Sequence, residues 1–407
     1  MPTLTSAAVV AVIALLAPLA VRLTGLRVPD VVLQILLGIV VGPQVLGWAR
    51  ADQPVTVLSI VGLAFLLLLA GLEIDFDRLR GRVLRLTTAG FVLSFALALV
   101  VGGVLGAVSL VGSPLLLAVI LSATSLGIIL PVLKDAGQID TPFGQVVVAG
   151  ASIAEVVPIV LLSVLFSRDA TGVGSQLVLL VTFLGLIAAV GLLIVGFERS
   201  ARISQALTAL QETTAEVRIR GAVALLMVFA ALATAFGLEA ILGAFLAGAT
   251  LKLLDRDQTM THRAFHQKLQ AVGFGAFIPF FFVATGMSLD VRSLINSPAT
   301  LARVPIFLAA LLIVRAIPAF LYASLAQRRG QLVAAGLLQA TSLSIPVVAG
   351  AIGVQLGAIR PANYVALVAA GLLSVVLFPL LAVPLLSPRD GRGGPDSVNG
   401  SATPRPG

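Results

Sequence analysis

The sequence predicts an all-helical protein that crosses a lipid bilayer many times. Hydrophobic residues make up 59% of the 407 residues, and charged residues make up only 11%, whereas a soluble domain carries about 25% charged residues. Such a chain has too few charges to cover a water-exposed surface, and its hydrophobicity also excludes intrinsic disorder. The sequence contains no cysteine, which excludes disulfides, cysteine-ligated metals and thiol nucleophiles.

Apolar runs long enough to span a bilayer follow one another along the chain. A transmembrane helix needs about 20 apolar residues, whereas the strands of a membrane barrel would alternate between polar and apolar residues. The runs do not alternate, so they are interpreted as helices. We predict about 13 transmembrane helices, at residues 4–21, 30–48, 55–73, 87–110, 113–133, 143–166, 174–196, 217–236, 238–254, 271–289, 302–325, 331–355 and 362–386.

Basic residues gather in the loops on one side of the predicted membrane, where the positive-inside rule places the cytoplasm. With the N-terminus outside, few remain in the outer loops, namely Arg50, Arg168, Arg292, Arg303 and Arg360. We therefore expect a plasma-membrane protein with an outside N-terminus and a cytoplasmic C-terminus. The basic loops explain the net charge of +8. Nucleic acid is not an expected partner, because no aromatic residues interleave with the basic ones.

Two short patterns each occur twice, and the two copies lie almost equally far apart in both cases. Residues 71–75, GLEID, are followed by GMSLD at 286–290, and the ATSL of residues 123–126 returns at 340–343. The duplication predicts two six-helix repeats, and the single helix between them inverts the second, as in secondary transporters. The expected parts are a first repeat at 1–166, a linker helix and cytoplasmic connector at 167–216, a second repeat at 217–386 and a disordered cytoplasmic tail at 387–407.

Glu155 is the acidic residue predicted at the centre of a span, and Arg315 is the basic residue near mid-span. An ionisable group at the bilayer centre costs at least ~2.5–3.5 kcal/mol, so such groups indicate function by default. The alternative is a structural ion pair between the two that locks two helices together. Ser152 lies three residues before Glu155 on the same helix face, where its hydroxyl could bond the carboxylate, a bound ion or its own helix.

The repeated ATSL segments place hydroxyl groups at the middle of two predicted spans. Each is followed by a proline, which removes a backbone donor and clashes with the preceding turn, so we predict that both helices are interrupted there. The carbonyls of an unwound stretch, with hydroxyls and one carboxylate, would suit a small cation, and irregular backbone at this depth must line an enclosed or wet cavity. An ordinary proline kink is the alternative. The predicted ion-binding hydroxyls belong to Thr124, Ser125, Thr341 and Ser342, and the predicted interrupting residues are Gly127, Pro131 and Pro346.

Sequence motifs of other functional classes are absent. His262 and His266 are spaced for a metal, but no third ligand is evident, so a solvated loop is the better interpretation. There is no zinc-protease motif, no Walker loop and no dinucleotide fingerprint. We therefore expect neither an enzyme nor an ATP-driven pump, and no resident metal or other cofactor.

Four motifs in order resemble the Kef-type cation:proton antiporters, and the likeness runs over about residues 5–386. They are QILLGIVVGP at 34–43, LLLAGLEID at 67–75, GLEAILGAFLAG at 237–248 and PFFFVATGM at 279–287. The resemblance implies the inverted-repeat antiporter fold, with a core domain, a dimerisation panel and a homodimer. It also implies that Glu155 is the ion-binding carboxylate and that Arg315 compensates its charge. Ala154 departs from the polar residue that many members carry before this acid.

A buried carboxylate that binds either a proton or a cation predicts a secondary antiporter that exchanges Na⁺ or K⁺ for H⁺ by alternating access. Because Glu155 is the one predicted titrating group at the site, the expected exchange is one for one and electroneutral. The short tail following the last span leads us to expect no nucleotide-binding domain and no nucleotide partner. A sodium-coupled organic-anion symporter on a similar fold and a transport-dead membrane sensor remain as alternatives.

Overall fold

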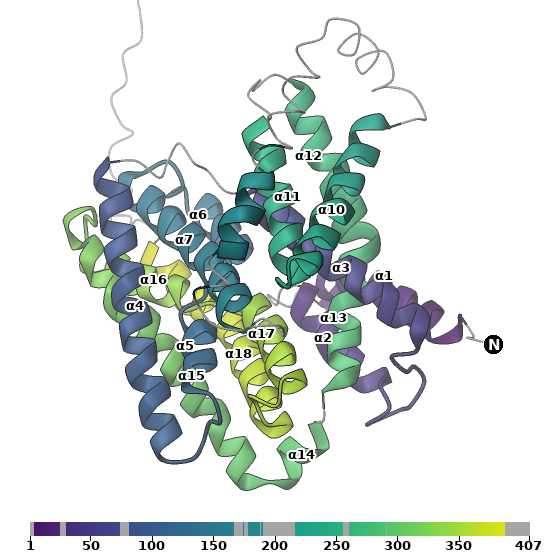
Figure 1. Cartoon of the computed structure of the whole chain (residues 1–407). Coiled ribbons are helices and arrows are strands. Elements are labelled where there is room, and N and C mark those ends of the chain that lie inside the picture. Colours follow the sequence, from purple (N-terminus) through teal and green to yellow (C-terminus); the bar gives the residue numbers. More distant parts are fainter. Residues whose placement is uncertain are drawn as a thin grey trace, which may run out of the picture.

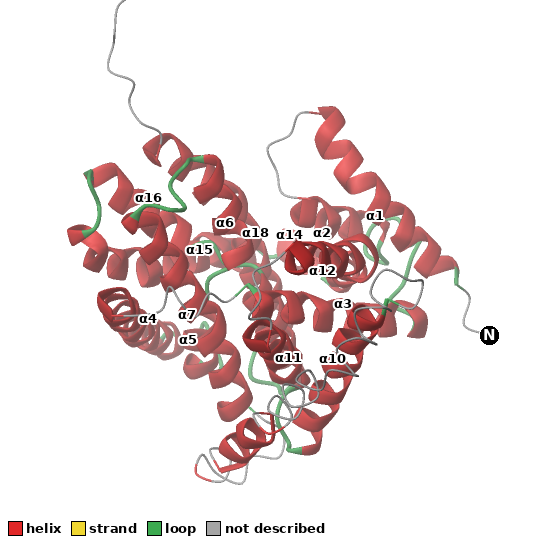
Figure 2. Ribbon diagram, turned by 90° about the horizontal axis from the view of Figure 1, so that it is seen from above, coloured by secondary structure: helices red, strands yellow, loops and turns green. Residues whose placement is uncertain are grey.

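A computed structural model of the chain describes residues 4–24, 30–73, 81–166, 174, 178–187, 189, 216–254, 260–289 and 291–386. Every regular element within these ranges is a helix (Figure 2). Nine helices in the described ranges are long and apolar enough to cross a membrane, and shorter apolar helices lie between them. The all-helical, multi-pass membrane fold predicted from the apolar runs is therefore confirmed.

The helices follow the predicted apolar runs in order. Their bounds are α1 Thr5–Thr24, α2 Asp30–Val41, α3 Gln53–Leu72, α4 Gly81–Ala107, α5 Pro114–Leu121, α6 Leu126–Asp135, α7 Pro142–Leu165, α10 Val217–Ala235, α11 Ala240–Leu254, α12 Met260–Val272, η1 Gly273–Phe277, α13 Ile278–Ser288, α14 Val291–Asn296, α15 Pro298–Ala319, η2 Phe320–Ser324, α16 Arg329–Gln339, α17 Ser344–Gln355 and α18 Pro361–Leu386. In the predicted linker at 167–216, the described part includes a helix at Val178–Ile187. The predicted tail at 387–407 lies outside the described residues.

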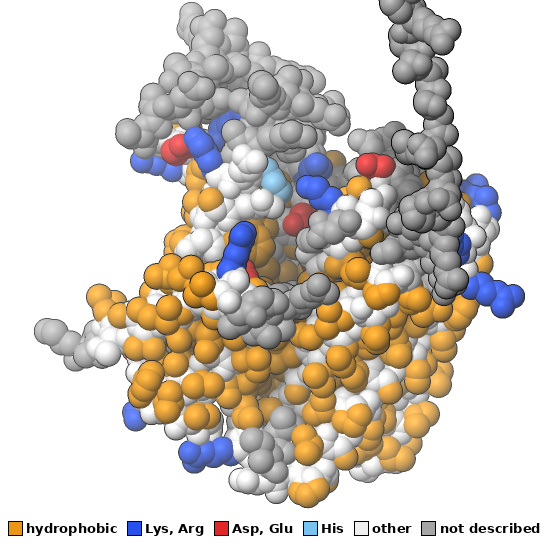
Figure 3. Space-filling view, turned by 180° about the vertical axis from the view of Figure 1, so that it is seen from behind, with side chains coloured by type: hydrophobic (Ala, Val, Ile, Leu, Met, Phe, Trp, Pro, Cys, Tyr) orange, Lys and Arg blue, Asp and Glu red, His pale blue; other side chains and the backbone are white. Residues whose placement is uncertain are grey.

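The described helices pack as two groups that stand side by side (Figure 1). One group, called the panel here, consists of α1, α2, α3, α10, α11, α12, η1 and α13, and its main contacts are α3 with α11 and α2 with α13. The other group, called the core here, consists of α4, α5, α6, α7, α14, α15, η2, α16, α17 and α18. Hydrophobic side chains cover the middle of the face in Figure 3, and charged side chains lie toward its ends, as a lipid-facing surface requires.

Glycines allow the backbones of the panel helices to touch. A Cβ atom at Gly71 of α3 would overlap the carbonyl oxygen of Phe245 in α11, and one at Gly248 of α11 would overlap the carbonyl oxygen of Leu68 in α3. Between membrane helices, small residues permit close van der Waals packing where the hydrophobic effect supplies little attraction. The pairing of α3 with α11 therefore depends on these two glycines.

Replacing Gly248 by valine is expected to cost the panel about 1–3 kcal/mol or more, because the new side chain meets backbone that cannot move aside cheaply. The measurement is the melting temperature and the yield of monodisperse protein in detergent. Gly103→Val in α4 is the matched control, since a Cβ there meets no atom within 4 Å. Equal losses in both variants would show that valine in a helix, rather than the α3–α11 contact, is responsible.

Both predicted helix interruptions are present in the core. The first separates α5 from α6 at residues 122–125, and the second separates α16 from α17 at residues 340–343. The breaks thus fall on the repeated ATSL segments, and Gly127, Pro131 and Pro346 lie after them, inside α6 and α17. Pro346 occupies the first turn of α17, where a missing N–H breaks no helical bond. These three residues follow the breaks. A continuous helix through Ser342 would bring its carbonyl against the ring of Pro346, so the interrupting role stays a prediction.

Candidate functional site

The two helix breaks are hydrogen-bonded to each other. The Ser125 N–H donates to the Thr341 carbonyl oxygen at 2.9 Å, and the Leu343 N–H donates to Ser125 Oγ at 3.1 Å. The Thr124 hydroxyl donates to the carbonyl oxygen of Gln339, at the end of α16. Backbone groups released by unwinding need such partners when they are buried. The breaks therefore form one buried crossing, which we call the crossing below.

Helix α7 lies against the crossing and presents Glu155 to it. The Thr124 N–H donates to the carbonyl oxygen of Ala154 at 3.2 Å. The carboxylate of Glu155, the next residue, accepts a hydrogen bond from the Leu126 N–H, the first of α6. A helix N-terminus favours negative charge because its N–H groups have no intrahelical partner. Glu155 is partly buried at this position.

A second carboxylate, which the sequence did not place at the site, comes from the panel. Glu73 caps the C-terminal end of α3 and interacts electrostatically with Glu155. Its Oε2 atom lies 4.0 Å from the position that a Cβ atom on Gly127 would take. The predicted span at 55–73 put Glu73 at the end of a helix. The sequence contains one signal that sets Glu73 apart. The repeated motif has an acid, Glu73, in its first copy and Ser288 at the same position in its second.

Two of the predicted hydroxyl ligands already take part in the bonds of the crossing. Thr124 Oγ1 donates to Gln339 and accepts a hydrogen bond of 2.9 Å from Arg315 Nε. Ser125 Oγ accepts from the Leu343 N–H. Both side chains are buried. Each hydroxyl oxygen has two lone pairs, and one of them already accepts a hydrogen bond within the crossing. One lone pair on each oxygen is therefore left for an ion.

The other three predicted hydroxyls differ in what they contact. Ser152 Oγ donates to the Val148 carbonyl at 3.0 Å, within its own helix. Thr341 Oγ1 donates to the Leu337 carbonyl at 3.2 Å in the same manner. Ser342 Oγ is buried and has no hydrogen-bond partner among the described residues. A buried hydroxyl without a partner calls for an explanation such as a bound ion or water, so Ser342 is the hydroxyl at the crossing that retains full bonding capacity.

Arg315 of α15 is buried, at 4% exposure, and it bonds neutral oxygens. Its Nε atom donates to Thr124 Oγ1 at 2.9 Å, one terminal nitrogen donates to Ser94 Oγ at 2.8 Å, and the other donates to Gln339 Oε1. Among the described residues its hydrogen bonds include none to the Glu155 carboxylate, and the predicted charge compensation stays a prediction. The rigid fork of guanidinium donors can satisfy itself on several neutral acceptors at once. Arg315 thus joins α15 to α4, α16 and the first break.

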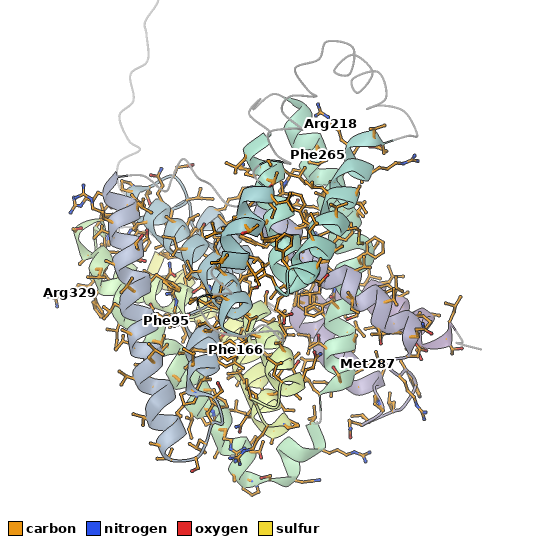
Figure 4. The ribbon with its side chains drawn as sticks, in the orientation of Figure 1. Phe95, Phe166, Arg218, Phe265, Met287 and Arg329 are labelled. Atoms are coloured by element: carbon orange, nitrogen blue, oxygen red, sulfur yellow. The ribbon has the colours of Figure 1, made fainter. Side chains whose placement is uncertain are left out.

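Metal-binding clusters are not found in the part of the chain that the structure covers, where no group of three or more His, Cys, Asp or Glu residues could hold a metal ion. His266, on α12, lies with its ring Nε2 2.9 Å from the side-chain nitrogen of Gln270. The side chains in Figure 4 show that the interiors of both helix groups are filled largely by carbon atoms. The polar groups gathered around the crossing therefore stand out as the candidate site.

Two broken helices that cross beside a carboxylate, within a multi-pass helical bundle, are an arrangement typical of secondary transporters. The chain belongs to the sodium/hydrogen exchanger family, whose transmembrane model matches residues 11–387. The resemblance to cation:proton antiporters seen in the sequence motifs is therefore confirmed, and the relatives are transporters, not enzymes.

Among its relatives, the chain is 29% identical over 390 residues to the putative Na⁺/H⁺ antiporter YjbQ of Bacillus subtilis, an alignment covering 92% of this chain and 62% of that protein. The chain thus spans less than two thirds of that relative's length. It is 28% identical over 271 residues to the Na⁺/H⁺-K⁺ antiporter GerN of Bacillus cereus, covering 66% of this chain and 67% of GerN. The fold matches the sodium proton antiporter MjNhaP1 of Methanocaldococcus jannaschii with a TM-score of 0.67 at 19% identity, covering 95% of this chain and 100% of that one.

Proposed function

We propose that this protein exchanges a monovalent cation, Na⁺ or K⁺, for a proton by alternating access, and that Glu155 binds the two in turn. The observation that carries the proposal is the position of the Glu155 carboxylate, between the N-terminus of α6 and the second acid, Glu73. The names of the relatives supply the two cations, because YjbQ is named for sodium and GerN for sodium and potassium. A carboxylate, hydroxyls and exposed carbonyls offer such cations the hard oxygen ligands they prefer.

Competition for one carboxylate supplies the coupling. A bound proton or cation neutralises Glu155, and the site can then move against lipid at low cost, whereas an empty charged site is costly to bury. Glu73 lies in the panel and Glu155 in the core, so a rocking motion of one group against the other would change the distance between the two acids. We propose that this motion opens the site to each side of the membrane in turn.

We propose that hydroxyl oxygens of the crossing complete the ion site. Ser342, whose hydroxyl has no partner among the described residues, is the first choice for a hydroxyl ligand. Thr124, Ser125, Ser152 and Thr341 hold the local backbone and would contribute through their remaining lone pairs. Arg315 would act by holding the residues of the crossing in place, without contacting the ion.

We also propose how the protein sits in its membrane. The exposed Arg82, Arg85, Arg328 and Arg329 belong to the loops that the sequence assigns to the inside, which supports a cytoplasmic C-terminus and an outside N-terminus in the plasma membrane. The two repeats would be inverted copies, and two protomers would associate through their panels. Association through the panels would leave both cores free to move.

The exchange should be electroneutral, with one proton carried per cation. Glu155 is the group proposed to change its occupant, while Glu73 would keep one charge state through the cycle. In liposomes containing the purified protein, the exchange rate should be independent of a membrane potential imposed by a second ion gradient. A rate that rises or reverses with the potential would contradict the single-acid cycle. Loss of that response in Glu73→Gln would then identify Glu73 as the second titrating group.

The proposed function is tested in everted membrane vesicles loaded with a pH-sensitive dye. Respiration acidifies the vesicle lumen, and Na⁺, K⁺ or Li⁺ is then added in separate experiments. The cation that the protein prefers should release protons from the lumen fastest. The response should need no organic anion, which separates the exchanger from an organic-anion symporter. Vesicles that respond to none of the cations, despite containing the folded protein, would contradict the proposal and favour a transport-dead sensor.

A further inference from the structure

Helix α7 contains a proline whose missing N–H exposes one particular carbonyl. In a regular α-helix the carbonyl of residue i accepts from the N–H of residue i+4. Pro158 lies inside α7 and has no N–H, so the Ala154 carbonyl lacks its regular partner. That same carbonyl oxygen accepts the Thr124 N–H of the first helix break at 3.2 Å. Pro158 therefore creates the acceptor by which α7 is attached to the first break.

The second helix break is attached to α7 as well, through a side chain. Gln339, the last residue of α16, is 1% exposed. Its Nε2 atom donates to the Val147 carbonyl oxygen of α7 at 2.7 Å, while its Oε1 atom accepts from Arg315. A Cβ atom at Gly150 would lie 2.9 Å from Gln339 Nε2, so the glycine leaves room for the amide. The fit of this amide against α7 is therefore specific to the position.

The two attachments bracket the segment that leads to Glu155. Val147 and Ala154 are seven residues apart on α7, which is about two helical turns or roughly 10 Å, so their carbonyls lie on the same side of the helix. One is held by the second break through Gln339, and the other is held by the first break through Thr124. Glu155 follows directly after Ala154, the attachment to the first break. Rotation or sliding of α7 relative to the crossing would have to break both.

We propose that Pro158 and Gln339 are positioning residues that attach α7 to the two helix breaks at both ends of this two-turn segment, and so hold Glu155 at the crossing. The proposal rests on the proposed function for its consequence, ion exchange at Glu155. The attachment itself is a property of the fold and can be measured without transport. Neither residue titrates, and neither is proposed to contact the ion.

The first test is Pro158→Ala, which returns an N–H to the helix to compete for the Ala154 carbonyl. Amide hydrogen exchange at residues 122–126 should become faster, because the Thr124 N–H loses its partner, while the melting temperature is kept or raised. The cation concentration for half-maximal exchange should rise roughly fivefold to tenfold, the equivalent of about one net hydrogen bond. The control is Pro305→Ala, an exposed proline inside α15, which should alter neither quantity.

The second test is Gln339→Glu, which keeps an acceptor for Arg315 and removes the donor to Val147. It should raise the half-maximal cation concentration by a similar factor in folded protein, whereas Gln331→Met, a buried glutamine of the same helix, should not. Unchanged hydrogen exchange at 122–126 in Pro158→Ala would overturn the attachment. Altered hydrogen exchange with wild-type cation dependence would overturn the positioning role. If the wild-type protein transported no ions, only the proposed function would fail. Amide hydrogen exchange at 122–126 would still show whether Pro158 attaches α7 to the first break.

Discussion

Replacing Glu155 by glutamine should abolish cation-driven proton movement while the protein remains folded. Glutamine matches glutamate in size and can still accept the Leu126 N–H, so the crossing should keep its shape. An amide, however, neither takes up a proton near neutral pH nor offers a charge to a cation. The expected loss is complete, because this carboxylate is the group proposed to bind the proton and the cation in turn.

The dye assay in everted vesicles measures this effect, with the amount of folded protein determined by gel filtration of the solubilised membranes. Asp140→Asn is the matched control, since it makes the same acid-to-amide change at an exposed position between α6 and α7. It should transport as the wild type does. Exchange of wild-type size in Glu155→Gln would move the site elsewhere, and Glu73 would be the next residue to replace.

Replacing Arg315 by leucine should cause the largest loss of stability among single substitutions in the core. The change removes the donors that satisfy Thr124, Ser94 and Gln339. A buried polar group left unsatisfied costs about 1–3 kcal/mol, and leucine cannot restore any of the three bonds. Lysine should rescue poorly, because one ammonium group cannot reproduce the fork that reaches three separate oxygens.

Thermal unfolding in detergent checks this, with Arg329→Leu as the control. Arg329 is exposed at the start of α16, at the edge of the molecule in Figure 4, so its loss should shift the melting temperature little. The alternative role, compensation of the Glu155 charge, makes a different prediction. An Arg315→Leu protein with wild-type stability and a shifted pH dependence of exchange would support charge compensation and contradict the bonding pattern of the crossing.

Hydrophobic patterning predicted most of the fold, because in a membrane protein each spanning segment must satisfy its backbone internally. Patterning also located the two interrupted helices, whose breaks fall on the repeated segments. Proline indicated the breaks through its missing N–H, and Pro346 lies in the first turn of the next half-helix. The unwound residues are the Ser and Thr segments, whose backbone groups find partners across the crossing. Such partners depend on tertiary structure and leave little trace in one sequence.

The sequence predicted only part of the site, because tertiary packing alone brings some of its residues together. Glu155 was found because a charge at mid-membrane is expensive and therefore conspicuous. Glu73 was passed over because it ends a helix, and only the tertiary arrangement brings the end of α3 near Gly127 of α6 and near Glu155. Gln339 carries no charge and lies at the end of an ordinary apolar helix, so composition gave no reason to select it. Glu73 and Gln339 are recognised by the residues that lie next to them in the fold, and their residue types alone do not single them out.

The most direct test of the account is whether cation binding displaces a proton from Glu155. Purified protein in weakly buffered detergent solution, at a pH where the site is protonated, is mixed with sodium or potassium while a pH dye reports free protons. We expect a release of about one proton per protein from the wild type and none from Glu155→Gln, with choline as the inert cation. Equal release from the two proteins, or none from a wild type that binds the cation, would contradict it.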